Sequence, residues 1–133
     1  MSTVVATNIN TDALVGSASA NAITVRGEGS ATTSLQQGLC KVWARFHGSS
    51  FSTSGDDTFN VTCLTDDGTG DYTITIANDF ATANFVQLSS GNEYNSINDS
   101  ANTAGTMQFG NYNNSGARTD TARCFVAGFG DLA

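Results

Sequence analysis

Proline is absent from the sequence and positive charge is scarce, with five Lys and Arg residues against twelve Asp and Glu and a formal net charge of −7 at pH 7. Nucleic-acid binding needs a stripe of basic residues that displaces counterions from phosphates, and the five, spread from Arg26 to Arg123, do not form one. Anionic membrane surfaces also attract basic segments. The charge balance therefore argues against both partners.

Long apolar runs are missing as well. No run approaches the ~18 consecutive apolar residues of a membrane-spanning helix. Residues 1–25 lack the basic start and the apolar stretch of a secretory signal peptide. We therefore expect synthesis in a cytoplasm and no insertion into a membrane.

Cysteine is represented by Cys40, Cys63 and Cys124, which match no C-x-x-C motif. Three thiols cannot all pair within one chain, so we expect reduced, buried cysteines that act as small apolar side chains. A nucleophilic thiolate would need a nearby base, and His47 is the one histidine of the sequence. No serine lies in the sharp turn that exposes a hydrolase nucleophile. The sequence therefore predicts a protein that is not an enzyme.

Short alternating runs of Thr, Val, Ile and aromatic residues, separated by Gly, Asn, Asp and Ser, make up most of the chain. Such runs are typical of strands joined by turns. About seven or eight strands at regular spacing predict an all-β fold, an antiparallel β-sandwich or jelly-roll-like domain. The 133 residues are enough for one domain. We assign residues 22–133 to the sandwich and residues 1–21 to an extended N-terminal arm.

The alternation also predicts where individual elements lie. Val42, Ala44 and Phe46 share one face of the clearest strand with Cys40. Residues 49–55 are interpreted as either a return strand or a loop. Strands are expected within residues 22–26, 39–48, 59–64, 72–77, 83–90, 105–112 and 121–130, one helical turn at 34–38 and a long polar loop at 90–104.

The acidic segment DDGTGD, residues 66–71, separates two alternating runs. Two runs of period two around a Gly/Asp cluster predict a β-hairpin, with Ile74 on the inward face. A calcium loop would need a downstream bidentate Glu, which is missing. Carboxylates on successive strand residues point to opposite faces, which does not suit a glycosidase pair. We therefore expect a turn here, with no metal, no cofactor and no catalytic carboxylates.

The predicted arm carries too few apolar residues to fold back on its own. Apolar groups spaced along an extended segment suit grooves on neighbouring subunits, where the backbone pairs by strand addition; a merely disordered tail is the alternative. Trp43 is interpreted as an anchor in the core or at an interface rather than as a sugar-binding partner of His47. The candidate partner-binding residues are Val4, Val5, Ile9, Leu14, Val15 and Trp43.

Three segments carry a resemblance to a known family: SLQQGLCKVWARFHG, DDTFNVTCLTDDGTGDYTITIANDFATANF and the C-terminal CFVAGFGDLA. They resemble β-domains of tail-fibre-like virion proteins from tailed bacteriophages, especially marine and cyanobacterial ones. The likeness covers roughly residues 33–86 and the last ten residues. Asp67 stands where Asn is usual before the glycine of the turn. The resemblance implies a non-enzymatic virion structural protein, usually a homotrimer.

A projecting fibre needs a coiled-coil or solenoid stalk, and the sequence shows neither heptads nor repeats. We therefore expect a trimeric capsid decoration (cement) protein on the virion surface. Its partners would be the major capsid protein or other virion proteins, with a host surface glycan as a further candidate. A short tail fibre or receptor-binding tip is the first alternative, and a stand-alone carbohydrate-binding module is the second.

Overall fold

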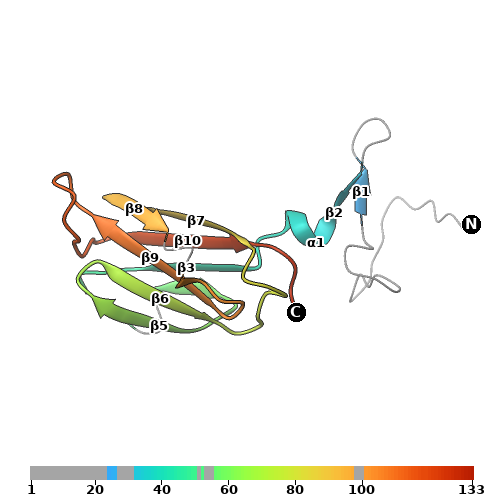
Figure 1. The fold of residues 1–133 in the computed structure, drawn as a ribbon, viewed down its shortest axis with the longest axis horizontal. Coiled ribbons are helices and arrows are strands. Elements are labelled where there is room, and N and C mark those ends of the chain that lie inside the picture. Colours follow the sequence, from blue (N-terminus) through green and yellow to red (C-terminus); the bar gives the residue numbers. More distant parts are fainter. Residues whose placement is uncertain (1–23, 27–31, 51, 53–55, 98–100) are drawn as a thin grey trace, which may run out of the picture.

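Two four-stranded antiparallel sheets pack face to face in the computed structural model, which describes residues 24–26, 32–50, 52, 56–97 and 101–133 (Figure 1). One sheet has the strand order β4-β3-β10-β7 and is called the β3–β10 sheet; the other has the order β5-β6-β9-β8 and is called the β6–β9 sheet. The predicted all-β sandwich is thereby confirmed. The strands are β1 (Thr24–Arg26), β2 (Thr32–Ser34), β3 (Val42–Phe46), β4 (Asp57–Phe59), β5 (Val61–Gly68), β6 (Asp71–Ile76), β7 (Val86–Gly91), β8 (Tyr94–Ile97), β9 (Thr106–Tyr112) and β10 (Cys124–Phe129).

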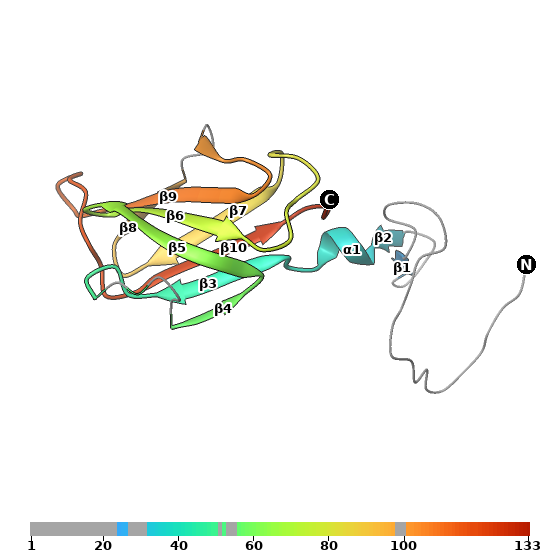
Figure 2. The same ribbon diagram turned by 90° about the horizontal axis from the view of Figure 1, so that it is seen from below.

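Strands β1 and β2 form a separate two-stranded hairpin, which lies beyond one end of the sandwich (Figures 1 and 2). The single turn α1 (Leu35–Gly38) joins it to β3 and confirms the helical turn predicted at 34–38. Ser34 caps this turn, since its Oγ accepts a hydrogen bond from the Gln37 backbone N–H at 3.2 Å. The predicted arm and its boundary at residues 21 and 22 lie outside the described residues.

The core between the sheets follows from the alternation of β3 and β6, in which every second side chain is buried. Aromatic rings fill its centre. The Phe46 ring lies edge-on to Tyr72 at 5.2 Å and to Phe109 at 5.8 Å between centroids, a favoured arrangement. The buried apolar residues are Val42, Ala44, Phe46, Leu64, Tyr72, Ile74, Ile76, Phe80, Phe85, Met107, Phe109, Cys124 and Val126.

The alternation predicted across residues 59–64 is wrong, because the chain changes sheets in the middle of it. Phe59 ends β4 in one sheet and is 52% exposed, whereas Leu64 in β5 of the other sheet is fully buried. Asn60 makes the corner with a φ of 57°. Its Nδ2 donates to the carbonyls of Lys41 and Asn78 at 3.0 Å each, and its Oδ1 accepts the Asn78 backbone N–H at 2.8 Å. A register shift after Val61 then resets which side chains face inward.

The polar loop predicted at residues 90–104 is wrong in part, because β8 lies inside it and pairs with β9. This strand is at the edge of the β6–β9 sheet and three of its four residues are exposed, so it shows no apolar alternation. Strand β4 was missed for a similar reason, since it is a three-residue edge strand. Short edge strands of polar residues leave little signal in a sequence.

The first prediction concerns Ile74, which is fully buried, as its place in the alternation indicates. An unpaired carboxylate in the core costs several kcal/mol, against a total stability of about 5–15 kcal/mol for a domain. We expect Ile74→Asp to unfold the sandwich in a thermal melt. Thr75→Asp is the matched control, because Thr75 projects from the opposite side of the same strand and should stay folded. A melting temperature of Ile74→Asp within a few degrees of the parent would contradict the inward placement.

Candidate interaction surface

The outer side of the β3–β10 sheet carries a row of apolar side chains that crosses all four strands. In the strand register Phe59 lies opposite Trp43, Trp43 opposite Ala127, and Ala127 opposite Leu88. Directly opposite residues of antiparallel strands project from the same face. Because the neighbours Val42 and Ala44 of β3 are buried in the core, this row faces away from it.

Further apolar residues extend the row on both sides, and the whole group is called the apolar sheet face. Phe129 lies opposite Val86, and Phe125 projects on the same side as Ala127. The exposed fractions are 52% for Phe59, 60% for Val86, 56% for Leu88 and 40% for Phe125. Large contiguous apolar patches on a folded protein mark interaction sites. The apolar sheet face consists of Trp43, Phe59, Val86, Leu88, Phe125, Ala127 and Phe129.

Polar residues border this face at one end of β3. The Arg45 guanidinium lies 3.1 Å from a carboxylate oxygen of Asp56, and His47 Nε2 lies 3.6 Å from the same oxygen. Asp57 is opposite Arg45 in the strand register. An apolar centre with a charged rim is the usual anatomy of a protein–protein interface.

Strands β3 and β10 also carried a signal for this face in the sequence. In the run CFVAGF of β10, apolar residues occupy both the inward and the outward positions of the strand. The same is true of VWARF in β3, with the exception of Arg45. Continuous apolar runs are typical of strands that are covered on both sides. Trp43, the sequence-predicted anchor, is half-buried within the face. The arm residues Val4, Val5, Ile9, Leu14 and Val15 lie outside the described residues.

The acidic segment forms the predicted turn between β5 and β6. Each carboxylate has a partner within the chain: Asp66 Oδ1 accepts the Gly68 N–H at 3.0 Å, and Asp67 Oδ2 accepts the Thr73 hydroxyl at 2.6 Å. Asp71 pairs with Arg118 at 2.8 Å. In the described part of the chain, no three His, Cys, Asp or Glu side chains converge on a point where a metal could bind.

Tyr72 and Asp120 tie this turn to the segment that precedes β10. Asp120 Oδ1 accepts hydrogen bonds from the Gly70 N–H at 2.6 Å and from the Tyr72 hydroxyl at 2.9 Å. Gly70 has a φ of 64°, and a Cβ there would lie 2.6 Å from the Thr119 nitrogen, so the turn requires glycine. Burial, together with the hydrogen bond and the negative charge of Asp120, raises the pKa of Tyr72 far above its usual range.

The three cysteines are free thiols, as predicted, but burial is complete only for Cys124. Its Sγ accepts a hydrogen bond from Asn111 Nδ2 at 3.0 Å. Cys40 and Cys63 are half-buried. Among the described residues, no hydrogen bond joins His47 to a thiol, and its charged neighbour is Asp56.

No family model, no curated protein and no solved structure matches the chain. Within the described residues, no helix has the length and the apolar character that crossing a membrane requires.

The second prediction tests the buried Tyr72 hydroxyl through pH. A pKa raised in the folded state contributes stability that is complete below the unfolded value of about 10 and is lost as the pH rises above it. Tyr72→Phe should lose about 1–2 kcal/mol at neutral pH because its hydrogen bond to Asp120 is gone. Above about pH 10 the variant should lose stability less steeply than the parent. Urea unfolding from pH 7 to 11 measures both effects, and parallel curves for the two proteins would refute the assignment.

The third prediction concerns the acidic turn. Asp67→Asn keeps an oxygen that can accept the Thr73 hydroxyl, and the bond lies on the exposed surface. We therefore expect a change in the free energy of unfolding below about 0.5 kcal/mol. Adding calcium or a chelator should leave the melting temperature of the parent unchanged. A calcium-dependent rise in melting temperature, lost in Asp67→Asn, would instead identify a metal site.

Proposed function

We propose that the chain is a non-enzymatic structural protein of a bacteriophage virion, a trimeric decoration (cement) protein on the outside of the capsid. The apolar sheet face is the observation that carries this proposal. Exposed fractions of 52% for Phe59 and 56% for Leu88 leave apolar area that a second protein surface would remove from water. The sequence resemblance to virion β-domains supports the same assignment.

The occupant of the apolar sheet face is a second copy of this chain. A net charge of −7 disfavours nucleic acid and anionic membranes, and the face itself is apolar at its centre. Three copies around a threefold axis, each turning this face toward the axis, would bury it in one closed assembly. The rim pair of Arg45 and Asp56 would then lie at the border of the contact.

Attachment to the capsid falls to the N-terminal arm, residues 1–21, in this proposal. The β1–β2 hairpin and α1 lie beyond one end of the sandwich (Figure 1), and the arm precedes this hairpin in the sequence. An extended segment with spaced apolar residues can bind grooves between capsid subunits by strand addition. Trimer formation and capsid attachment thus use different parts of the chain.

The fourth prediction separates these two contacts. Leu88→Glu places a charge on the β7 side of the apolar sheet face, at a side chain that is 56% exposed in the single chain, and should shift the protein from trimer to monomer in analytical ultracentrifugation. Thr65→Glu is the matched control, because Thr65 is exposed on the other sheet, and it should remain a trimer. Deletion of residues 2–20 should leave a folded trimer that no longer sediments with capsids lacking the protein.

Each outcome of this experiment assigns a contact. A Leu88→Glu protein that is folded and still trimeric would remove the apolar sheet face from the trimer contact. A truncated protein that sediments with capsids at full occupancy would move the capsid contact into the sandwich. Binding of neither the parent nor the truncated protein to capsids would contradict the decoration role itself.

A short tail fibre or receptor-binding tip is the alternative role within a virion. Both roles would use a trimer, so the number of copies per particle decides between them. Gel densitometry of purified particles should show copies comparable in number to the major capsid protein if the chain decorates the capsid. A few copies per particle would indicate the tail instead.

A further inference from the structure

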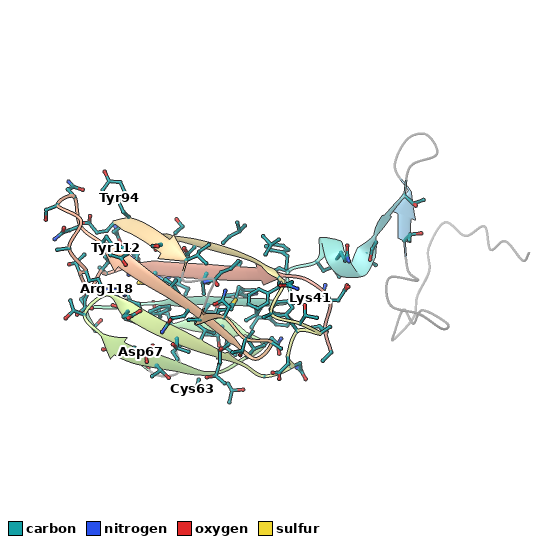
Figure 3. All side chains as sticks on the ribbon, in the orientation of Figure 1. Lys41, Cys63, Asp67, Tyr94, Tyr112 and Arg118 are labelled. Carbon is teal, nitrogen blue, oxygen red and sulfur yellow. The ribbon has the colours of Figure 1, made fainter. Side chains whose placement is uncertain are left out.

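The outer side of the β6–β9 sheet differs from the apolar sheet face, because it is largely polar apart from Cys63 on β5 and two tyrosines at one end. Tyr94 in β8 lies directly opposite Tyr112 in β9, so both side chains project from this side. Tyr94 is 64% exposed, more than any other large hydrophobic side chain of the described residues. Figure 3 shows Tyr94, Tyr112 and Arg118 grouped at one end of the sandwich.

Arg118 holds the second tyrosine in place. Its guanidinium carbon lies 5.2 Å from the centroid of the Tyr112 ring, within the range of a cation–π contact. The same group pairs with Asp71 at 2.8 Å and donates to the Gly70 carbonyl at 3.1 Å. A Cβ at Gly110 would lie 2.7 Å from a guanidinium nitrogen of Arg118, so glycine at this position leaves room for the guanidinium close to the β9 backbone. The platform around Tyr112 is therefore ordered in advance of any ligand.

A shallow depression of about 320 Å³ is lined by Glu93, Asn113, Asn114 and Ser115, of which Glu93 and Asn113 are the chain neighbours of Tyr94 and Tyr112. Its volume is near the lower end of the ~300–1,000 Å³ typical of small-ligand sites. Asn113 orders the loop, because its Oδ1 accepts the N–H groups of Ser115 and Ala117 at 3.0 Å each. The Glu93 carboxylate and the Asn114 amide have no hydrogen-bond partner among the described residues, so they are available to a ligand.

We propose that this end of the sandwich binds a neutral oligosaccharide, with Tyr94 as the stacking platform and Glu93, Asn113 and Asn114 as partners for sugar hydroxyls. A tyrosine ring offers an apolar surface with a polar tip, which suits the C–H face of a sugar ring. Amide and carboxylate groups hydrogen-bond adjacent hydroxyls. An acidic sugar is disfavoured, because Glu93 is negative and Arg118 is already paired with Asp71.

The site does not depend on the proposed virion role. It lies on the sheet opposite the apolar sheet face, and at the end of the sandwich away from α1 and the C terminus (Figures 1 and 3). A trimer that buries the apolar sheet face would keep Tyr94 accessible, because Tyr94 belongs to the other sheet.

A printed array of neutral, sialylated and sulfated oligosaccharides, probed with the full chain, tests this site. We expect binding to neutral oligosaccharides only. The strongest neutral oligosaccharide of the array is then titrated into the isotope-labelled protein and followed by NMR. Shifts should be confined to residues 93–94 and 112–118, and Tyr94→Ala should raise the dissociation constant by about tenfold or more. Tyr94→Phe keeps the ring and should bind within a few-fold of the parent.

Thr65→Ala is the control, because Thr65 is exposed on β5, the strand of the β6–β9 sheet farthest from β8, and its affinity should equal that of the parent. Absence of any neutral oligosaccharide binding overturns the proposal. A preference for sialylated or sulfated sugars, or unchanged affinity in a folded Tyr94→Ala protein, overturns it as well. These results leave the capsid and trimer experiments unaffected, so the two proposals fail separately.

Discussion

The hydrogen bond between the buried Tyr72 hydroxyl and Asp120 connects the aromatic core to the loops at one end of the sandwich. The Tyr72 ring packs in the aromatic centre of the core against Phe46 and Phe109. Its hydroxyl reaches Asp120, whose same oxygen also holds the Gly70 turn. A buried polar group that is satisfied fixes one arrangement, while an unsatisfied one would be costly. Core packing and the conformation of the end loops are thus set together.

The two outer sides of the sandwich have different chemistry although both belong to antiparallel sheets. On the β3–β10 sheet, Trp43, Leu88 and Phe125 project outward, and a sheet with apolar residues on both sides is normally covered on both. On the β6–β9 sheet the outward positions of β6 are Asp71, Thr73 and Thr75, which water solvates well. The two outer sides of the domain therefore differ, because one is apolar and suits contact with another protein surface while the other is polar and suits exposure to water.

The strands that were predicted well are those in which the alternation of apolar and polar residues alone decides which side chains are buried. In β6, Tyr72, Ile74 and Ile76 alternate with threonines, and burial follows the alternation along the whole strand. The DDGTGD segment contains the glycine that its turn requires, so the hairpin was predictable as well. At Asn60 the chain passes from one sheet to the other, and the side of the strand that faces the core changes there. The alternation of apolar residues across this corner therefore mispredicts which side chains are buried.

The candidate surfaces were harder to predict because they depend on pairing between distant strands. Trp43 was predicted to be an anchor from its residue type, but its neighbours on the face, Phe59, Ala127 and Leu88, come from three other strands. Tyr94 belongs to an edge strand that looked like a polar loop, and its partner Tyr112 follows far along the chain. Composition gives no information about which residues a register places side by side.

The corner at Asn60 also bears on the free edges of the two sheets. On one side of the sandwich the chain passes directly from β4 into β5, and on the other β7 runs into β8 after only two intervening residues. The edge strands of the two sheets are thus linked by short stretches of chain, and β4 has only three residues. Free edges of flat sheets invite pairing between molecules, and short or covered edges discourage it. The three-residue edge at β4 consequently offers little backbone for pairing with another strand, so this border of the β3–β10 sheet presents mainly side chains.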